Sequence, residues 1–484
     1  MSELNRRSFL RAAAVTGGLA VAGPFHGLLA RSASAAVDPG YGPLLTGIPD
    51  MRDGKVRLHL PAGFNYRSFS WAGDPLIGGG IVPARQDGMA AFDASRGRTR
   101  LVRNHEVNGN SAGGALPHCP PYDSAALGGT TTVEVFRTGS GARTWVSCSG
   151  TQNNCSGGQL PWGAWITAEE TVNGPDVGPD FTGASNAALT KPHGYIFEVP
   201  AGENPEQVQA RLPIMQAGRF AHESVALDPD TGYLYQTEDN FAFPSGFYRY
   251  RAPFDPRRSK SILDGGTLEM LKVKGIHQAD LSIGFKRGVR FDTEWVSIAD
   301  PDPAMAAGTT NDQALVAVSA QGLALGAAKF SRLEGVIHNR GRLYFTSTQG
   351  GTPDERGPSG GFGEGYGQVW AYDPKREVLT MVYESPGKQT LDLPDNLTIS
   401  PRGTVMLCED GSVDNYLRGL TSDGRLFDFA RNAIPGREGE EFAGATFGAF
   451  GRTDGGMTLF VNIQASAPNS FSFAIWGPWG QGPF

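Results

Sequence analysis

Acidic residues stand at the ends of short apolar runs at intervals along the whole chain of 484 residues. Adjacent carboxylates repel each other unless a cation lies between them. If the fold gathers these groups in space, they form an oxygen-rich cage for hard metal ions. The candidate metal ligands of this kind are Glu106, Glu169, Glu170, Glu223, Glu238, Asp239, Glu334, Asp395, Asn396, Glu409 and Asp410.

A cysteine lies within the most distinctive of these segments. Cys155 stands between Asn154 and Ser156-Gly157-Gly158, and a strand-like run over residues 162–168 then leads to the Glu169–Glu170 pair. A thiolate among oxygen ligands suits a softer, redox-capable metal such as iron better than calcium. We therefore add Cys155 to the candidate ligands. The alternative is a disulfide-bonded cysteine on a glycine turn beside a solvated glutamate pair.

Two further segments add different chemistry. His222 directly precedes Glu223, and a histidine in this place either binds a transition metal or orients the carboxylate beside it. Arg332 and Glu334 lie two residues apart in an extended run, so they share one face of a strand. If Glu334 binds a metal, Arg332 lies beside it and can fork onto a phosphate or carboxylate oxygen. We predict Arg332 as the substrate-binding and catalytic residue, with a plain Arg–Glu pair as the alternative.

Some of the acidic pairs also have simpler explanations. Glu238-Asp239-Asn240 offers hard oxygens suited to Ca²⁺, but a solvated hairpin end has the same composition. Asp395-Asn396 and Glu409-Asp410 flank one predicted strand, and one of these two pairs is expected to be a turn.

The elements that must position these residues are short strands. Gly accounts for 67 residues and Pro for 33, while charged residues make up only 19%, which favours an all-β protein. Strand-like runs bounded by turn residues occur at 130–136, 194–199, 232–237, 246–250, 342–348 and 367–372. Their recurrence predicts a β-propeller, with six blades, loop insertions at 170–190 and 350–366, and few short helices. A β-sandwich pair is the competing architecture.

The N-terminus carries an export signal. Arg6-Arg7, an apolar stretch over residues 12–22 and the small residues 33–35 follow the order of a cleavable twin-arginine signal peptide. We divide the chain into this signal (1–35), a lead-in (36–60) and a propeller domain (61–484). The apolar stretch is too short to span a bilayer, so we expect a periplasmic or secreted protein with no stable membrane anchor. Its partner in export is the twin-arginine machinery.

The charge of the chain limits its partners. Removal of residues 1–35, which carry four Arg and one Glu, changes the net charge from −7 to −10. Such an acidic protein lacks the basic surface that nucleic-acid binding requires.

Four cysteines are too few for a disulfide scaffold, although pairing of Cys148 with Cys155 or Cys119 remains open. We expect a monomer.

Taken in order, the segments resemble the PhoX family of secreted alkaline phosphatases. The matching segments are LVRNHE (101–106), NNCSGGQLPWGAWITAEE (153–170), KPHGYIFEVP (191–200), GRFAHESVALDP (218–229), YQTEDN (235–240), FSRLEGV (330–336), GQVWAYDP (367–374), LPDNLTISPRGTVMLCEDG (393–411), EFAGATF (441–447) and LFVNIQASAP (459–468).

This resemblance implies a twin-arginine-exported β-propeller that cleaves phosphate monoesters. It also implies a site with two ferric ions and two or three calcium ions bridged by an oxo group. On this basis Cys155 matches the thiolate ligand of iron, Arg332 the phosphate-binding arginine, and the carboxylates the remaining ligands. The chain is shorter than well-known members, so loops that set the substrate range are expected to be absent.

Two other functions fit parts of the sequence. A calcium-dependent propeller hydrolase acting on lactones or phosphotriesters needs carboxylate and amide ligands but no thiolate. A periplasmic binding propeller stabilised by calcium needs no catalytic group. Metal content and turnover separate both from the phosphatase.

Overall fold

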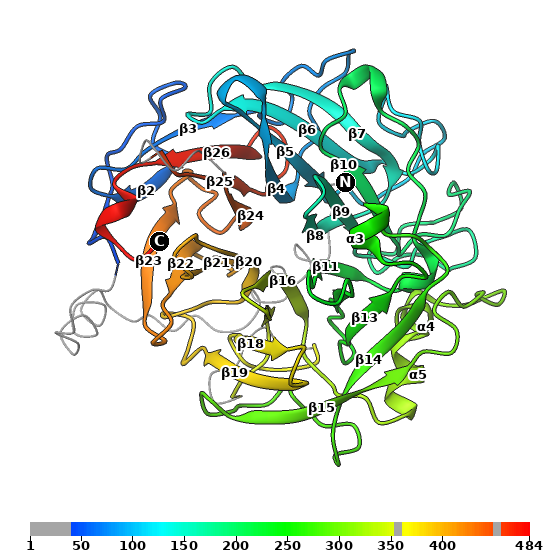
Figure 1. Ribbon diagram of the computed structural model, residues 1–484. Helices are drawn as coiled ribbons and strands as arrows, with labels where there is room; N and C mark the ends of the chain where they lie inside the picture. Colours follow the sequence, from blue (N-terminus) through cyan, green and yellow to red (C-terminus); the bar gives the residue numbers. More distant parts are fainter. Residues whose placement is uncertain (1–39, 353–360, 449–455) are drawn as a thin grey trace.

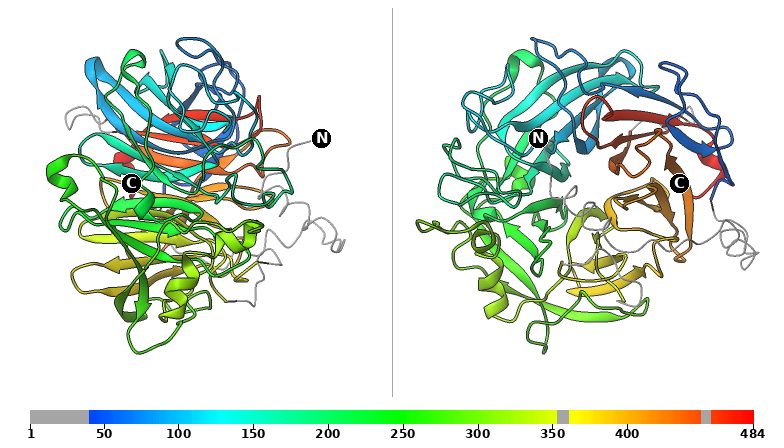
Figure 2. Two further views of the ribbon diagram at one scale, coloured as in Figure 1. Left: turned by 90° about the vertical axis from the view of Figure 1, so that its right-hand side faces the viewer. Right: turned by 180° about the vertical axis from the view of Figure 1, so that it is seen from behind.

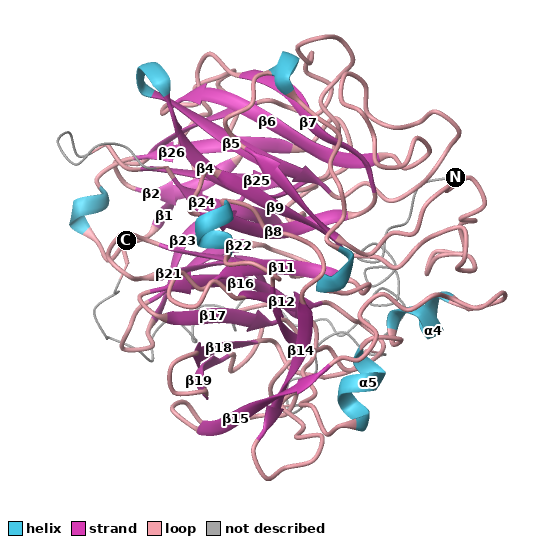
Figure 3. Ribbon diagram, turned by 45° about the vertical axis from the view of Figure 1, so that its right-hand side comes forward, coloured by secondary structure: helices cyan, strands magenta, loops and turns pink. Residues whose placement is uncertain are grey.

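The computed structural model describes residues 40–352, 361–448 and 456–484, so the predicted signal peptide lies outside the described residues. The fold is all-β, with sheets arranged around a centre in the manner of a propeller (Figure 1). Figure 2 shows the same ring of sheets from the side and from behind. Strands and loops dominate, and the labelled helices α4 and α5 lie at the periphery (Figure 3).

Three sheets are continuous series of neighbouring antiparallel strands. The first runs β4 (Gln86–Ala94), β5 (Arg98–His105), β6 (Gly128–Phe136), β7 (Arg143–Thr151). The second runs β8 (Asn154–Leu160), β9 (Ala164–Glu169), β10 (Ile196–Pro200). The third runs β24 (Phe442–Phe447), β25 (Thr458–Ile463), β26 (Phe471–Trp476), β3 (Asn65–Phe69), so that strands near both ends of the chain share one sheet.

Two larger sheets complete the ring. One runs β11 (His222–Leu227), β12 (Leu234–Glu238), β13 (Phe247–Arg251), β14 (Thr267–Val273), β15 (Arg290–Ser297) and then β19 (Val378–Glu384), β18 (Gln368–Asp373), β17 (Arg342–Ser347), β16 (Leu333–Asn339). The other runs β20 (Pro394–Ile399), β21 (Val405–Glu409), β22 (Tyr416–Leu420), β23 (Leu426–Asn432), β2 (Leu58–Pro61), β1 (Leu44–Leu45).

Helices are short. Among the described residues the α-helices are α3 (Pro256–Ser259), α4 (Asn311–Leu315) and α5 (Ser319–Ala324), and 3₁₀ turns occur at Ser95–Gly97, Pro205–Gln207, Met215–Ala217 and Trp479–Gln481. Within the described ranges, no helix has both the length and the apolar character needed to cross a membrane.

The six strand segments predicted from the sequence each overlap a strand, namely β6, β10, β12, β13, β17 and β18, with ends that differ by at most two residues. The expected lead-in is more ordered than its composition indicated. Leu44–Leu45 and Leu58–Pro61 form β1 and β2, and β2 pairs with β23. This segment therefore belongs to the sheet that carries β20.

The strands β4, β8, β11, β16, β20 and β24 form the inside of the ring. Each lies at the edge of its sheet, and each contacts the next in this order until β24 contacts β4. Antiparallel pairing with the second strand of the same sheet brings the start of each inner strand beside the end of its partner. The starts of the inner strands therefore meet at one end of the central channel.

The same irregularity recurs in all six of these inner hairpins. The register shifts between Gln86 and Met89 in β4. Equivalent shifts follow the first or second residue of β8, β11, β16, β20 and β24. A β-bulge bends its strand and turns a side chain out of the regular alternation. The bulges therefore redirect side chains at the same end of the channel.

Glycine permits the close approach of the inner strands. A Cβ on Gly157 would lie 1.8 Å from the carbonyl oxygen of Ile166, and one on Gly158 would lie 2.0 Å from that of Val225. Real Cβ atoms do not approach carbonyl oxygens so closely, so both positions require glycine. The Cys-Ser-Gly-Gly segment thus follows from the packing of β8 between β9 and β11.

Candidate metal centre

The bulges place acidic or thiol side chains at the start of five inner strands. Each is the second residue of its strand, and all five are at most 3% exposed: Asp87 in β4, Cys155 in β8, Glu223 in β11, Glu334 in β16 and Asp395 in β20. In the sixth inner strand the acidic residue, Glu441, directly precedes β24. The fold thus repeats one ligand position around the ring.

A second set of carboxylates comes from the ends of the neighbouring strands. Glu106 follows β5, Glu170 follows β9, Asp239 follows β12 and Asp410 follows β21. Because these strands run antiparallel to the inner ones, their ends lie beside the inner-strand starts.

Apart from Asp239, these side chains form overlapping groups, and within each group the ligand atoms all lie within 4.8 Å of one another. The groups are Glu106–Cys155–Glu170, Asp87–Glu106–Glu441, Glu223–Glu334–Asp395 and Asp395–Asp410–Glu441. Glu106, Asp395 and Glu441 each belong to two groups, so all four groups form one chain of neighbours. All members are buried except Asp410, which is partly exposed.

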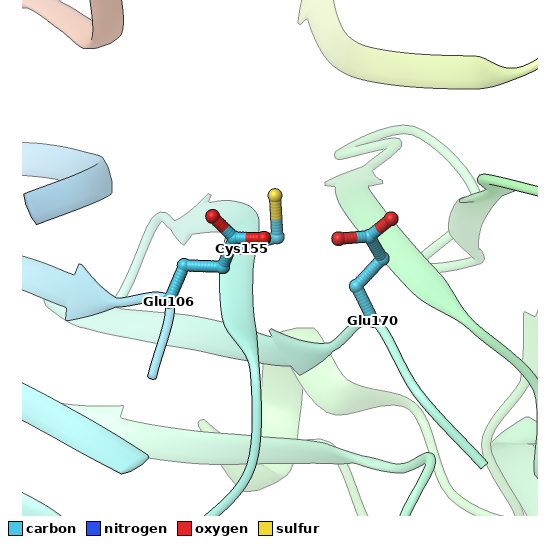
Figure 4. Close-up of side chains that lie close together, drawn as sticks. All are labelled: Glu106, Cys155 and Glu170. Carbon is cyan, nitrogen blue, oxygen red and sulfur yellow. The ribbon is translucent and has the colours of Figure 1, made fainter. Parts of the chain in front are cut away.

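Figure 4 shows the group that contains the thiol. The side chains of Glu106, Cys155 and Glu170 come from three different segments and point toward one another. All three were predicted as metal ligands from the sequence, and the structure places them together.

The guanidinium of Arg332 lies among the carboxylates. Its Nη2 donates to Glu334 Oε1 at 2.9 Å, and its Nε and Nη2 donate to Asp239 Oδ1 and Oδ2 at 3.1 and 2.7 Å. Arg332 is 3% exposed and has a φ of +41°, a conformation that few residues other than glycine adopt. Such strain at a buried arginine is characteristic of a functional position.

Burial and the surrounding carboxylates raise the pKa of Glu334 well above its ordinary value. Burial contributes most, followed by the charges of Asp239, Asp395 and Glu223, and Arg332 opposes them. Glu334 Oε2 has no hydrogen-bond partner among the described residues. A buried carboxylate oxygen of this kind either keeps a proton or faces a cation.

Glu169 lies outside the groups, although both Glu169 and Glu170 were predicted as metal ligands from the sequence. Its Oε1 accepts from Gln152 N and His193 Nδ1, and its Oε2 accepts from Gly194 N and Tyr195 N. A carboxylate offers about four lone-pair sites, so these bonds leave none for a metal. Neighbouring residues at a strand end point to opposite sides, which separates Glu169 from Glu170.

Glu409 is separated from Asp410 in the same way. Its Oε1 accepts from Asp392 N and Arg418 Nε, and its Oε2 accepts from Tyr416 N. Burial raises the pKa of Glu409 to about 7, while Arg418 opposes this effect. Asp410 is the member of the pair that joins a group.

Three other predicted ligands contact the centre through polar partners. Glu238 Oε2 accepts from Gly246 N and Tyr248 Oη, and Asp239 holds Arg332. Asn396 Nδ2 donates to Asp395 Oδ1 at 2.7 Å. Of these contacts, the one from Asn396 reaches a member of the groups, and the one from Asp239 reaches Arg332.

His222, which the sequence left undecided, bonds to the backbone. Its Nε2 lies 2.8 Å from the carbonyl oxygen of Gly218, and its ring stacks on Phe220 with centroids 3.7 Å apart. Burial lowers the pKa of His222 to about 3, so the ring is neutral. It orients the start of β11, which carries Glu223.

The sequence analysis missed two members of the groups, Asp87 and Glu441. Asp87 stands alone in the sequence, and Glu441, although paired with Glu440, precedes an apolar run instead of following one. Another pattern does relate Asp87 to a predicted ligand. In both Asp87-Gly88 and Glu334-Gly335, an acidic residue is followed by a glycine within the bulge.

All four cysteines are buried thiols. The disulfide pairings left open by the sequence are therefore not formed, and Cys155 Sγ lies 3.3 Å from Asp87 Oδ2.

A cavity of about 500 Å³ lies along the channel next to the candidate ligands. Residues that directly follow them, among them Gly88, Ser156, Ser224 and Gly335, line its wall. Each inner strand pairs within its own sheet along one edge, and its other edge faces the channel.

The fold and the site define the class: a β-propeller protein with a buried, carboxylate-rich centre that contains a thiol and a guanidinium. The model of the alkaline phosphatase PhoX family matches residues 41–467. The chain therefore belongs to the alkaline phosphatase PhoX family, whose members are phosphoric monoester hydrolases.

The solved structure of a PhoX protein agrees with the fold. PhoX of Pseudomonas fluorescens, in complex with vanadate, a transition state analogue, is 19% identical and superposes with a TM-score of 0.63 over 91% of this chain and 98% of that one. Two other solved structures are more distant. A gluconolactonase of Xanthomonas campestris is 12% identical, with a TM-score of 0.38 over 91% of this chain and 99% of that one. Virginiamycin B lyase of Staphylococcus aureus is 10% identical, with a TM-score of 0.36 over 85% of this chain and 99% of that one. No curated protein matches the sequence.

Proposed function

We propose that this protein hydrolyses phosphate monoesters at metal ions held by the carboxylates and the thiol of the centre. The observation that carries the proposal is the position of Arg332, which donates to Glu334 in the middle of the candidate ligands. Family membership supports the same reaction.

The donor set fits a mixture of iron and calcium. The groups bring carboxylates and one thiol within 4.8 Å of one another in a buried setting, where unbalanced negative charge is strongly unfavourable. Multivalent cations remove this cost. Carboxylate oxygens suit calcium, and Cys155 beside Glu106 and Glu170 suits ferric iron. We propose two ferric ions and two or three calcium ions.

In this scheme the ions, when bound, supply positive charge that stabilises the oxygens of the transferring phosphoryl group. Arg332 contributes hydrogen-bond donors fixed in direction by Asp239, so the guanidinium needs no reorganisation as charge develops on the phosphate oxygens. Glu334 limits the positions that the guanidinium can take. Burial of these groups excludes bulk water and strengthens each interaction.

Three further features belong to the proposal. β15 pairs with both β14 and β19, so we interpret the nine-stranded sheet as two blades joined at their rims and the fold as a six-bladed propeller. The twin-arginine segment supports export to the periplasm or the exterior. The acidic surface charge and the lack of a predicted spanning segment support a protein without nucleic-acid partners or a membrane anchor.

Elemental analysis of the exported protein, paired with assays on p-nitrophenyl phosphate before and after calcium chelation, tests the proposal. We expect iron and calcium together, with phosphatase activity that chelation removes and calcium restores. Calcium without iron, with turnover of lactones or phosphotriesters instead, would identify the calcium hydrolase. Full metal loading without turnover of any ester would identify a binding protein.

A further inference from the structure

The contacts of Glu169 connect three segments of the chain. Gln152 N lies 2.8 Å from Glu169 Oε1, and Gly194 N and Tyr195 N lie 2.8 and 3.1 Å from Glu169 Oε2. Gln152 stands three residues before Cys155, and Glu169 itself directly precedes Glu170. One buried carboxylate thus links the segment that leads to the thiol with the segment that leads to the neighbouring ligand.

His193 completes the link. Its Nδ1 lies 2.6 Å from Glu169 Oε1, and its Nε2 lies 3.6 Å from Asp123 Oδ2, within ion-pair distance. The side chains of His193, Glu169 and Asp123 are fully buried. Tyr122 packs against the imidazole edge-to-face, with ring centroids 5.5 Å apart. The imidazole therefore has little freedom to turn.

Asp123 is itself fixed by the backbone. Its carboxylate accepts from Ala125 N at 2.9 Å, from Thr190 N and Thr190 Oγ1 at 2.7 and 2.9 Å, and from Lys191 N at 2.9 Å. The series Asp123–His193–Glu169 thus runs from a fixed loop to the end of β9.

Glu170 and Asn153 extend the link to the candidate ligands. Glu170 N donates to the carbonyl oxygen of Asn153 at 3.0 Å, and Asn153 Nδ2 donates back to Glu170 O and Oε2, both at 3.1 Å. A shift of Glu169 would therefore move the backbone on both sides of the Cys155–Glu170 pair.

We propose that Glu169, bridged through His193 to Asp123, is a positioning residue that fixes Cys155 and Glu170 in the geometry required of metal ligands. This inference rests on the proposed function, because it assigns Glu169 a role in the same metal centre. Partners of ligands that set their orientation typically change metal affinity by about 10- to 100-fold when they are replaced.

The test replaces Glu169 by Gln. In either orientation of the amide, its NH₂ group faces at least one backbone N–H donor, so at least one of the four hydrogen bonds is lost while the volume is kept. We expect Glu169→Gln to lose metal to EDTA about 10- to 100-fold faster than the wild type. The visible absorption of the metal–thiolate pair should shift or weaken in the protein that still holds metal.

A second pair of variants addresses the histidine. The amide nitrogen of Asn reproduces the Nδ1 donor of an imidazole, whereas Leu offers none. We therefore expect His193→Asn to retain metal better than His193→Leu. If Glu169→Gln does not accumulate, this pair decides, and wild-type metal loss in His193→Leu would overturn the proposal.

Asp50→Asn is the matched control. Asp50 is 1% exposed and accepts from Arg52 N and Ser68 N at 2.8 and 3.0 Å, but it lies outside the metal groups. Two results would contradict the proposal. One is that Asp50→Asn loses metal as fast as Glu169→Gln, and the other is that Glu169→Gln keeps the metal loss rate and the absorption of the wild type. A wild-type protein without metal overturns both proposals, and one with metal but no phosphatase activity overturns only the function.

Discussion

Arg332 is held by Asp239 through two hydrogen bonds, from Nε to Oδ1 at 3.1 Å and from Nη2 to Oδ2 at 2.7 Å. Asp239 follows β12 and Arg332 directly precedes β16, and the Asp239 carboxylate is fully buried. Paired donors and acceptors of this kind fix the plane of a guanidinium as well as its position. In the proposed function, Asp239 therefore sets the direction in which the arginine would meet a phosphate.

Replacement of Arg332 by Ala should lower kcat on p-nitrophenyl phosphate by about 10²- to 10³-fold, because one preorganised donor to a charged transition state contributes this much. Metal content should stay at the wild-type level, which elemental analysis of the same preparation checks. Arg249→Ala removes a comparable half-buried pair with Glu269 and should leave kcat unchanged. Wild-type kcat/KM in Arg332→Ala would show that the assigned role is wrong.

Asp239→Asn should reduce kcat less than Arg332→Ala does, because the guanidinium remains but loses half of its fixed geometry. The double variant should be no slower than Arg332→Ala alone, since Asp239 acts through the arginine. Steady-state kinetics of the two single variants and the double variant measure this coupling. Additive losses would mean that Asp239 acts on its own.

The sequence predicted the all-β fold and the places of six strands because turn residues and β-branched runs are local signals. It could not choose between the members of the acidic pairs. Glu170 and Asp410 join the groups while Glu169 and Glu409 turn away, and this depends on which side of a strand end each residue occupies. That side is set by the register of pairing, which only the folded sheets define.

The bulges explain why the sequence did not predict Asp87 as a ligand. Asp87 stands alone in the sequence, yet the register shift between Gln86 and Met89 gives it the same position as Glu334 in β16. The repeat is structural rather than sequential, because loops of different length separate the blades. Without the ring of inner strands, nothing in the sequence relates Asp87 to Glu441.

Cys155→Ser should lower iron retention while calcium retention falls less, because a hydroxyl replaces the soft ligand and the carboxylates remain. Elemental analysis after dialysis against EDTA checks this ratio. Cys119→Ser changes a buried thiol that belongs to none of the groups and serves as the control. Equal loss of both metals in the two variants would argue against a direct role for the thiol.

Stability should depend on alkaline pH through Cys119. Burial raises the pKa of this thiol from 9.0 to about 11, an effect that Arg211 only partly opposes. Between these values the folded protein keeps a proton that the unfolded chain loses, so the stabilisation is complete below pH 9 and disappears as the pH rises through 11. The slope is at most about 1.4 kcal/mol per pH unit.

Denaturant unfolding of Cys119→Ala should accordingly show a free energy of unfolding that falls less steeply between pH 9 and 11 than that of the wild type. Val208→Ala removes apolar volume from the same cluster without a titrating group and should shift the curve by a constant amount. Parallel curves for all three proteins would contradict the assigned pKa.

Gly157→Ala should destabilise the protein and impair the centre together. The new methyl would lie 1.8 Å from the carbonyl oxygen of Ile166, which is backbone and cannot move without shifting β9. We expect a free energy of unfolding lower by about 3 kcal/mol, because overpacking of this kind strains a strand rather than a side chain. β8 and β9 also carry Cys155 and lead to Glu170, so iron retention should fall with stability. Gly47→Ala provides the matched control, since a methyl there meets no atom within 4 Å. A Gly157→Ala protein with the melting temperature and metal content of Gly47→Ala would show that β8 tolerates a wider spacing than its glycines indicate.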